Sequence, residues 1–212
     1  MQIDIFLYER MTALDAIGPM DVLARLPGAE VTFVGVEAGP VRTETNLGLV
    51  ADVGIADAPS PDILLVPGGF GQSDLMDHGP LLDWLRACHE QTTWTTSVCT
   101  GSLLLAAAGI LEGKKATSHW LALDQLPNYG AIPTEERVVF DGKVVTAAGV
   151  SSGIDMGLEL LARIAGDDLA QIVQLGIEYD PAPPFDAGSP RKAPAAAVEF
   201  LRSNSRFVLE GR

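Results

Sequence analysis

The chain has few cysteines, few histidines and few basic residues for its length. Of its 212 residues, 2 are Cys, 3 are His and 14 are Lys or Arg against 28 Asp or Glu, so the formal net charge is -14. Two cysteines do not make a disulfide framework, and an acidic surplus repels nucleic-acid phosphates. We therefore expect neither a disulfide-rich protein nor a nucleic-acid partner, and we interpret the charge as serving solubility.

Long apolar runs and metal-binding motifs are also absent. No run approaches the roughly 20 residues needed to cross a bilayer, and the opening "MQIDIFLYER" lacks the basic and apolar regions of a signal peptide. We expect a cytoplasmic protein without a membrane partner. There is no His-x-x-x-His pair, paired-cysteine set or Walker loop, so no metal or other cofactor is predicted.

What the sequence does contain is enough apolar material for one substantial core, because 47% of its residues are hydrophobic. No internal repeat or long linker divides the chain. The sequence therefore predicts a single domain over residues 1–212, in which residues 180–212 form a Pro-rich segment and a C-terminal tail that ends in a short helix.

Short apolar runs typical of buried parallel strands alternate with helical patterns. Strands are expected at residues 3–8, 31–36, 63–66 and 92–98. Helices are expected at residues 15–26, 79–90, 100–108, 152–166 and 167–179, with Pro19 in the first turn of its helix and Ser152 as a cap. Hairpins are expected at residues 41–53 and around the Asp141–Gly142 turn. This order predicts an α/β fold with a doubly wound, mostly parallel sheet sandwiched by helices.

The stretch "TTSVCTGSLLLAAAG", residues 95–109, places Cys99 between a predicted strand and a predicted helix. At such a corner a side chain projects from the top of the sheet. The N-terminus of the following helix favours a negative charge, so we expect the pKa of the Cys99 thiol to lie below its ordinary value. The alternative is a small buried core residue, which is the interpretation we give Cys88.

Two other sequence features follow predicted parallel strands and should meet Cys99 at the same sheet edge. In "PGGFG", Gly68 and Gly69 allow close backbone approach and offer N–H donors to a developing anion. In "ERMTALD", Asp15 lies in an apolar stretch where a carboxylate is costly unless it is used or paired. It is our candidate acid/base, and the alternative is a helix N-cap.

The residue after Cys99 is Thr100, so no imidazole base is adjacent in the sequence. Because Thr100 is adjacent to Cys99, we expect its hydroxyl to lie beside the sulfur. His119, in "KKATSHWLAL", could fold near the site and handle the proton in place of Asp15; the alternative is a structural role or a place in the second layer of side chains around the site.

These motifs resemble the ThiJ/PfpI superfamily of cysteine-containing, flavodoxin-like proteins. Within it the sequence is most similar to the isocyanide (isonitrile) hydratase family, through "LDAIGPMDVLARLP", "PGGFG", "TSVCTGSLLLAAAGILEGKKATSHW", "GAIPTEERVV", "AGVSSGIDMGLELLA" and "EYDPAPPFDAGSP". The resemblance implies a nucleophilic Cys99, an acidic partner at Asp15, and a site walled by Thr100 and the turn Gly149, Val150 and Ser151. It also implies a homodimer.

The same resemblance implies a lyase that adds water to an isonitrile through a covalent thioimidate on Cys99. The organic group of the substrate would meet apolar side chains near the site, Phe70 and Val150 among them, although core packing explains these residues equally well. Two alternatives remain open: a glyoxalase- or deglycase-like enzyme acting on small carbonyls, and a non-catalytic ligand or redox sensor in which Cys99 oxidises to a sulfinate.

Overall fold

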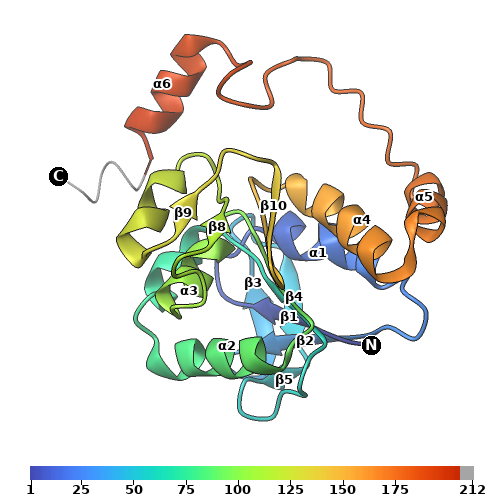
Figure 1. The fold of residues 1–212 in the computed structure, drawn as a ribbon. Coiled ribbons are helices and arrows are strands. Elements are labelled where there is room, and N and C mark those ends of the chain that lie inside the picture. Colours follow the sequence, from blue (N-terminus) through green and yellow to red (C-terminus); the bar gives the residue numbers. More distant parts are fainter. Residues whose placement is uncertain (206–212) are drawn as a thin grey trace.

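The structure, a computed structural model, describes residues 1–205 and is built on a seven-stranded sheet in the order β10-β11-β7-β6-β1-β2-β5 (Figure 1). All neighbouring strands run parallel except β10, which is antiparallel to β11. The strands of this sheet are β1 (Gln2–Leu7), β2 (Glu30–Gly35), β5 (Val53–Gly54), β6 (Ile63–Val66), β7 (Trp94–Val98), β10 (Val138–Asp141) and β11 (Val144–Ala147). The predicted α/β fold is confirmed.

Helices cover both faces of the sheet (Figure 1). On one face α1 packs against α4 and α4 against α5, while α2 and α3 lie together on the other. The helices are α1 (Ala13–Leu23), α2 (Gly79–Gln91), α3 (Gly101–Ala107), α4 (Ser152–Ala165), α5 (Asp167–Gly176) and α6 (Ala195–Ser203), with 3-10 helices η1 (Phe70–Leu75) and η2 (Leu123–Tyr129). Central strands such as β6 are wholly buried because both of their faces lie under helices.

Both predicted hairpins are present. Strands β3 (Gly39–Arg42) and β4 (Gly48–Ala51) pair antiparallel in a small sheet of their own. Strands β10 and β11 flank the turn at Gly142, which adopts a positive φ of 60° that glycine tolerates. A third small sheet pairs β8 (Lys115–Ala116) with β9 (Ile132–Pro133).

Two details of the predicted helices are wrong. Helix α1 begins at Ala13, so Pro19 lies inside it and not in its first turn. Ser152 does not cap α4, because Ser151 precedes the helix and Ser152 is its first residue, fully buried. Both errors concern helix starts, which tertiary contacts move by a residue or two.

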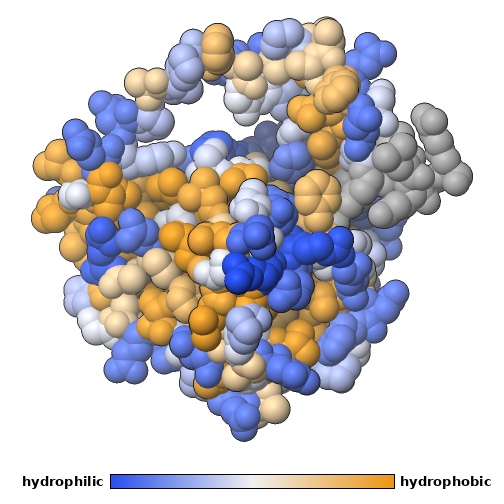
Figure 2. All heavy atoms as spheres, turned by 180° about the vertical axis from the view of Figure 1, so that it is seen from behind, coloured by the Kyte–Doolittle hydropathy of each residue, from blue (hydrophilic) through white to orange (hydrophobic). Residues whose placement is uncertain are grey.

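The C-terminal segment, by which we mean residues 180–205, leaves the end of α5 and returns across the body of the protein (Figure 1). Seen from behind, the segment arches over the body with a hollow beneath it (Figure 2). It ends in the predicted short helix, α6, which buries none of its own residues. The rest of the predicted tail, residues 206–212, lies outside the described residues. Across residues 1–205, no helix combines the length and apolar character that crossing a membrane requires.

Candidate active site

Cys99 lies in the sharp turn between β7 and α3, where its φ is 58°. This left-handed conformation is uncommon for a residue with a side chain. Hydrogen bonds to the end of β11, the neighbouring strand in the sheet, hold this conformation: the Cys99 N–H donates to the carbonyl oxygens of Ala147 at 3.0 Å and Ala148 at 2.8 Å. The Cys99 carbonyl accepts hydrogen bonds from the hydroxyls of Ser102 and Ser118. The backbone of the predicted corner is therefore fixed on both sides of the sulfur.

Asp15 lies in the first turn of α1 and faces the same corner. Its side chain is fully buried, and its Oδ2 accepts the Gly68 N–H at 2.9 Å. Its Oδ1 is buried without an N–H or O–H partner within residues 1–205, and the carboxyl interacts with the Cys99 thiol. The N-cap alternative for Asp15 is wrong, since Thr12 precedes the helix and the carboxyl bonds to another loop.

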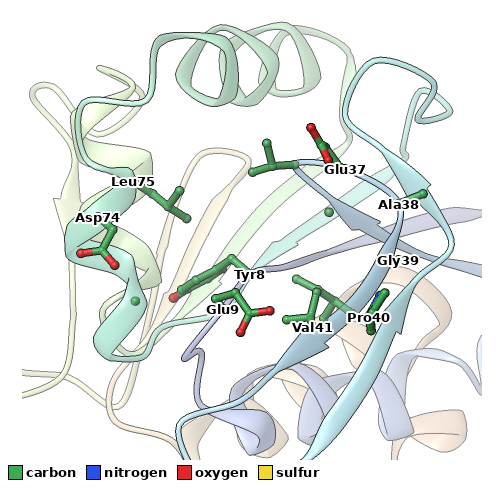
Figure 3. A pocket seen from close by; sticks show the side chains of 13 residues that line it. Tyr8, Glu9, Glu37, Ala38, Gly39, Pro40, Val41, Asp74 and Leu75 are labelled. Carbon is green, nitrogen blue, oxygen red and sulfur yellow. The ribbon is translucent and has the colours of Figure 1, made fainter.

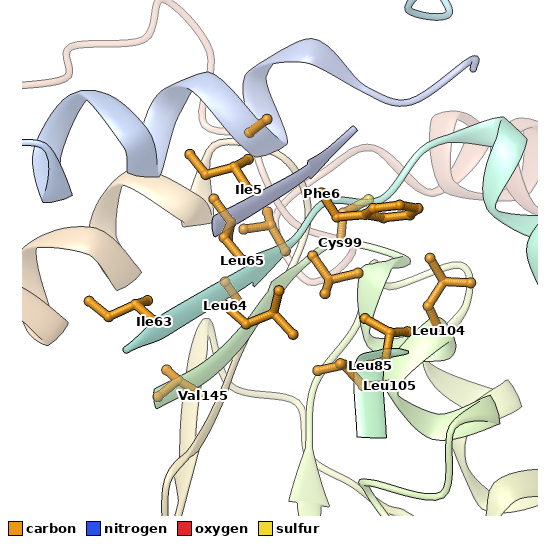
Figure 4. Close-up of a cluster of buried hydrophobic side chains, with 14 of the residues drawn as sticks. Ile5, Phe6, Ile63, Leu64, Leu65, Leu85, Cys99, Leu104, Leu105 and Val145 are labelled. Carbon is orange, nitrogen blue, oxygen red and sulfur yellow. The ribbon is translucent and has the colours of Figure 1, made fainter. Parts of the chain in front are cut away.

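Burial governs the ionisation of this pair. It raises the pKa of Asp15 from 3.8 to about 7, an effect that the Gly68 N–H opposes and the nearby Glu44 charge increases. Burial likewise raises the pKa of the Cys99 thiol, and the negative charge of Asp15 raises it further. The cause is that Cys99 belongs to the buried apolar core, and Figure 4 shows it among the hydrophobic side chains of that core.

The expectation of a lowered thiol pKa is therefore wrong for this structure. The N-terminus of α3 does contribute as expected, since the Thr100 N–H bonds to the sulfur, and the Val150 N–H from the turn before α4 adds a second bond; both lower the pKa of Cys99. The desolvation of a side chain that is only 5% exposed outweighs them. Two N–H donors nonetheless point at the sulfur and will stabilise a thiolate whenever one forms.

The Gly-Gly loop packs against the corner as closely as predicted. A Cβ on Gly68 would lie 2.5 Å from the Thr100 nitrogen, and one on Gly69 would lie 2.5 Å from the Met11 Cα. Its N–H groups, however, do not face a substrate: Gly68 donates to Asp15, and Gly69 donates to the Thr100 hydroxyl at 3.0 Å. The prediction that these N–H groups are available to a developing anion is wrong for this structure. Their role is to position the side chains of Asp15 and Thr100.

The turn formed by Gly149, Val150 and Ser151 closes the other side of the corner, as the resemblance implied. Val150 has a φ of 32°, which is strained for a β-branched residue. The His119 ring lies directly over Gly149, where an added Cβ would be 2.9 Å from the ring carbon Cδ2. Nδ1 of His119 accepts the Leu121 N–H at 3.3 Å.

A cleft of about 810 Å³ opens on this turn, which we call the 149–151 cleft. One wall consists of residues 117–120 and 148–151. The opposite wall comes from the C-terminal segment, through residues 188–191 and Arg202 of α6. Neither Cys99 nor Asp15 lines the cleft. Cys99 lies directly behind the first wall, since the Val150 N–H bonds to its sulfur and the Ser118 hydroxyl bonds to its carbonyl oxygen.

A separate cavity of about 490 Å³ lies between the end of β1, the β2–β3 connection and η1 (Figure 3). Carboxylates of Glu9, Glu37 and Asp74 line it. Glu9 accepts the Arg42 N–H and Asp74 pairs with Arg10. Neither Cys99 nor Asp15 lines this cavity. The predicted contact residue Phe70 begins η1, and its side chain is 59% exposed.

Sequence reasoning missed Glu44, Ser118 and the arginines of the 149–151 cleft. Glu44 reaches Asp15 from the β3–β4 hairpin, where Thr12 donates to it at 2.9 Å. No local sequence pattern marks this residue, since 29 positions separate it from Asp15. Ser118 directly precedes His119 in "KKATSHWLAL", so its position beside a candidate site residue is a signal that the sequence does contain.

The chain is similar to a known protein family and to several individual proteins. A model of the DJ-1/PfpI family matches residues 1–163. An isonitrile hydratase from Pseudomonas putida is 46% identical over 212 residues, which cover 100% of this chain and 93% of that protein. A glutathione-independent glyoxalase from Caenorhabditis elegans is 26% identical over 157 residues, 73% of this chain and 83% of that protein. A solved structure of a ThiJ/PfpI family protein from Pseudomonas syringae has a TM-score of 0.93 and 39% identity, covering 95% of this chain and 84% of that one.

Proposed function

The chain belongs to the DJ-1/PfpI family, and we propose that within it the protein is an isonitrile hydratase, a lyase that converts an isonitrile and water to an N-substituted formamide. The observation that carries the proposal is the buried pair of Cys99 and Asp15 at the β7–α3 corner. It is supported by the full-length similarity to the hydratase from Pseudomonas putida.

In the first step the Cys99 sulfur attacks the terminal carbon of R–N≡C. Asp15, as carboxylate, accepts the thiol proton and passes it to that carbon, so one S–C bond and one C–H bond form as the triple bond becomes a double bond. The product is a thioimidate, R–N=CH–S–Cys99. The N–H groups of Thr100 and Val150 stabilise the charge on sulfur as the proton leaves.

In the second step water adds across the C=N bond and gives R–NH–CH(OH)–S–Cys99. The C–S bond then breaks, the carbon–oxygen double bond forms, and the hydroxyl proton returns through Asp15 to the sulfur. The products are R–NH–CHO and the starting thiol. The two steps together consume one isonitrile and one water, so they require no oxidant or reductant.

The test is to mix the purified protein with phenyl isonitrile and measure N-phenylformamide. Cys99→Ala should reduce kcat/KM by at least about 10⁴-fold, since it removes the nucleophile, and Asp15→Asn should reduce it by about 10²–10⁴-fold. Cys88→Ala is the matched control, because Cys88 is also buried but lies in α2, away from the corner. It should keep wild-type turnover.

Turnover that survives in Cys99→Ala would refute the proposed chemistry. Methylglyoxal is the competing substrate, because the glyoxalase relative shares the family. Conversion of methylglyoxal without formamide production would favour that activity instead. For the sensor alternative, mild peroxide should add oxygen to Cys99 in a protein that turns over neither substrate.

A further inference from the structure

We propose that the C-terminal segment forms half of the substrate site and selects isonitriles that carry a large aromatic group, which would occupy the 149–151 cleft beside Trp120. This inference rests on the proposed function and adds to it the class of substrate and the residues that recognise it.

The size of the cleft is the first observation. At about 810 Å³ it falls in the range of sites that hold drug-sized ligands. An isocyano group has two heavy atoms and needs on the order of two water volumes, about 60 Å³. The cleft therefore offers far more room than the reacting group requires, and the remainder suits a bulky organic group.

Aromatic rings line this space. Trp120 and His119 lie side by side on one wall with ring centroids 6.0 Å apart. From the opposite wall the Arg202 guanidinium lies over the Trp120 ring, 5.7 Å from its centroid. A flat aromatic group can stack on an indole or a guanidinium face, and aromatic pairs contribute beyond their buried area. An aromatic group thus fits this wall better than an aliphatic chain does.

The charges of the cleft favour an uncharged group. Three acidic residues line it, Asp124, Glu135 and Glu136, and so do three arginines, Arg137, Arg191 and Arg202. Arg191 pairs with Glu135 across the cleft, and Arg137 pairs with Asp155 of α4. Two of the three arginines are thus already neutralised by carboxylates, and the signs on the lining nearly balance, so no large surplus charge is left to bind an ionic substituent.

The C-terminal segment lies beyond the part of the chain that the family model matches. That match ends at Arg163. The hydratase relative aligns with all 212 residues, including the segment that supplies Arg191 and Arg202. The part of the chain that builds the outer wall is therefore shared with the hydratase and lies beyond the family core, as expected of a specificity element.

The test compares 2-naphthyl isonitrile with methyl isonitrile in wild type, Trp120→Ala and Arg202→Gln. We expect the ratio of kcat/KM for the naphthyl over the methyl substrate to fall about tenfold in each variant, mainly through a higher KM, because the organic group is bound equally before and during reaction. Arg202→Gln covers the case in which Trp120→Ala fails to fold, since Arg202 is exposed on α6.

Arg163→Gln is the matched control. Arg163 also lies over an aromatic ring, 3.8 Å from the Phe140 centroid, but it is not part of the cleft. Its ratio should equal that of wild type. If the ratio is unchanged in both cleft variants while formamide still forms, the inference is wrong and the proposed function stands. If no isonitrile yields formamide, both fall.

Discussion

Asp15 and Cys99 are both buried acids, and burial raises the pKa of each. The raised pKa has a different consequence for each group. With a pKa of about 7, Asp15 exchanges a proton readily near neutral pH, which is what a group that accepts and returns one proton needs. The thiol keeps its proton until the carboxylate takes it, so the nucleophile forms where the substrate is bound and not before.

The pH dependence of turnover follows from this pair. Below pH about 7, Asp15 carries a proton and cannot accept the one on Cys99, so kcat/KM should fall about tenfold per pH unit on the acid side. Asp15→Asn should lower the rate and flatten this acid limb. The measurement is the profile of kcat/KM between pH 5 and 8 for both proteins. If the fall in kcat/KM at low pH persists in Asp15→Asn, the protonation of another group causes it.

At the scale of elements, the sequence predicted what depends on local pattern. The corner at Cys99, the buried strands and both hairpins follow from apolar runs and turn residues within a few positions of each other. The sequence could not predict which donors meet which acceptors across elements. The Gly68 and Gly69 N–H groups bond to Asp15 and to Thr100, residues that are 53 and 31 positions away.

The same limit explains the thiol pKa. The helix N-terminus beside Cys99 is visible in the sequence, whereas the packing of the apolar core that buries Cys99 is a property of the folded chain. Desolvation depends on this packing, so the sequence indicated the stabilising contribution and missed the opposing one. The roles assigned to Cys99 and Asp15 stay predictions until the variants are measured.

The junction of β6 and α3 gives a prediction about packing. Gly101 begins α3, and a Cβ there would lie 2.1 Å from the Val66 carbonyl oxygen of β6. Because backbone would have to move, Gly101→Ala should lower the free energy of unfolding by about 2–4 kcal/mol. Gly79→Ala, at the start of α2 where a Cβ meets nothing within 4 Å, should change it by less than about 1 kcal/mol. Urea unfolding measures both, and equal midpoints would contradict the prediction.

At the scale of the whole molecule, the surface leaves apolar side chains uncovered. Ile172 and Leu175 of α5 and Phe200 of α6 are 66%, 82% and 66% exposed. In Figure 2, apolar residues gather toward the edge of the body where α5 lies. Exposed apolar surface of this kind is typical of an interface. The predicted homodimer remains a prediction, as do the cytoplasmic location and the single domain.

The fold also buries a carboxyl away from the site. Asp4 of β1 is fully buried; its Oδ1 accepts a hydrogen bond from Gln2, and its Oδ2 has no partner among the described residues. Burial raises the pKa of Asp4 from 3.8 to about 6. A folded-state pKa above the unfolded one stabilises the fold at low pH, and that contribution is lost as the pH rises through the folded-state value.

The stability of the whole protein should therefore decrease between pH 5 and pH 8 in part because Asp4 ionises inside the core. Asp4→Asn keeps the shape without the charge, so its free energy of unfolding relative to wild type should rise by about 1 kcal/mol over this range. The matched control is Asp57→Asn, because Asp57 is exposed and its replacement should leave the pH dependence unchanged. Urea unfolding at both pH values measures the difference. Parallel curves for Asp4→Asn and wild type would show that Asp4 does not ionise in the folded state over this range, or that it does so without cost.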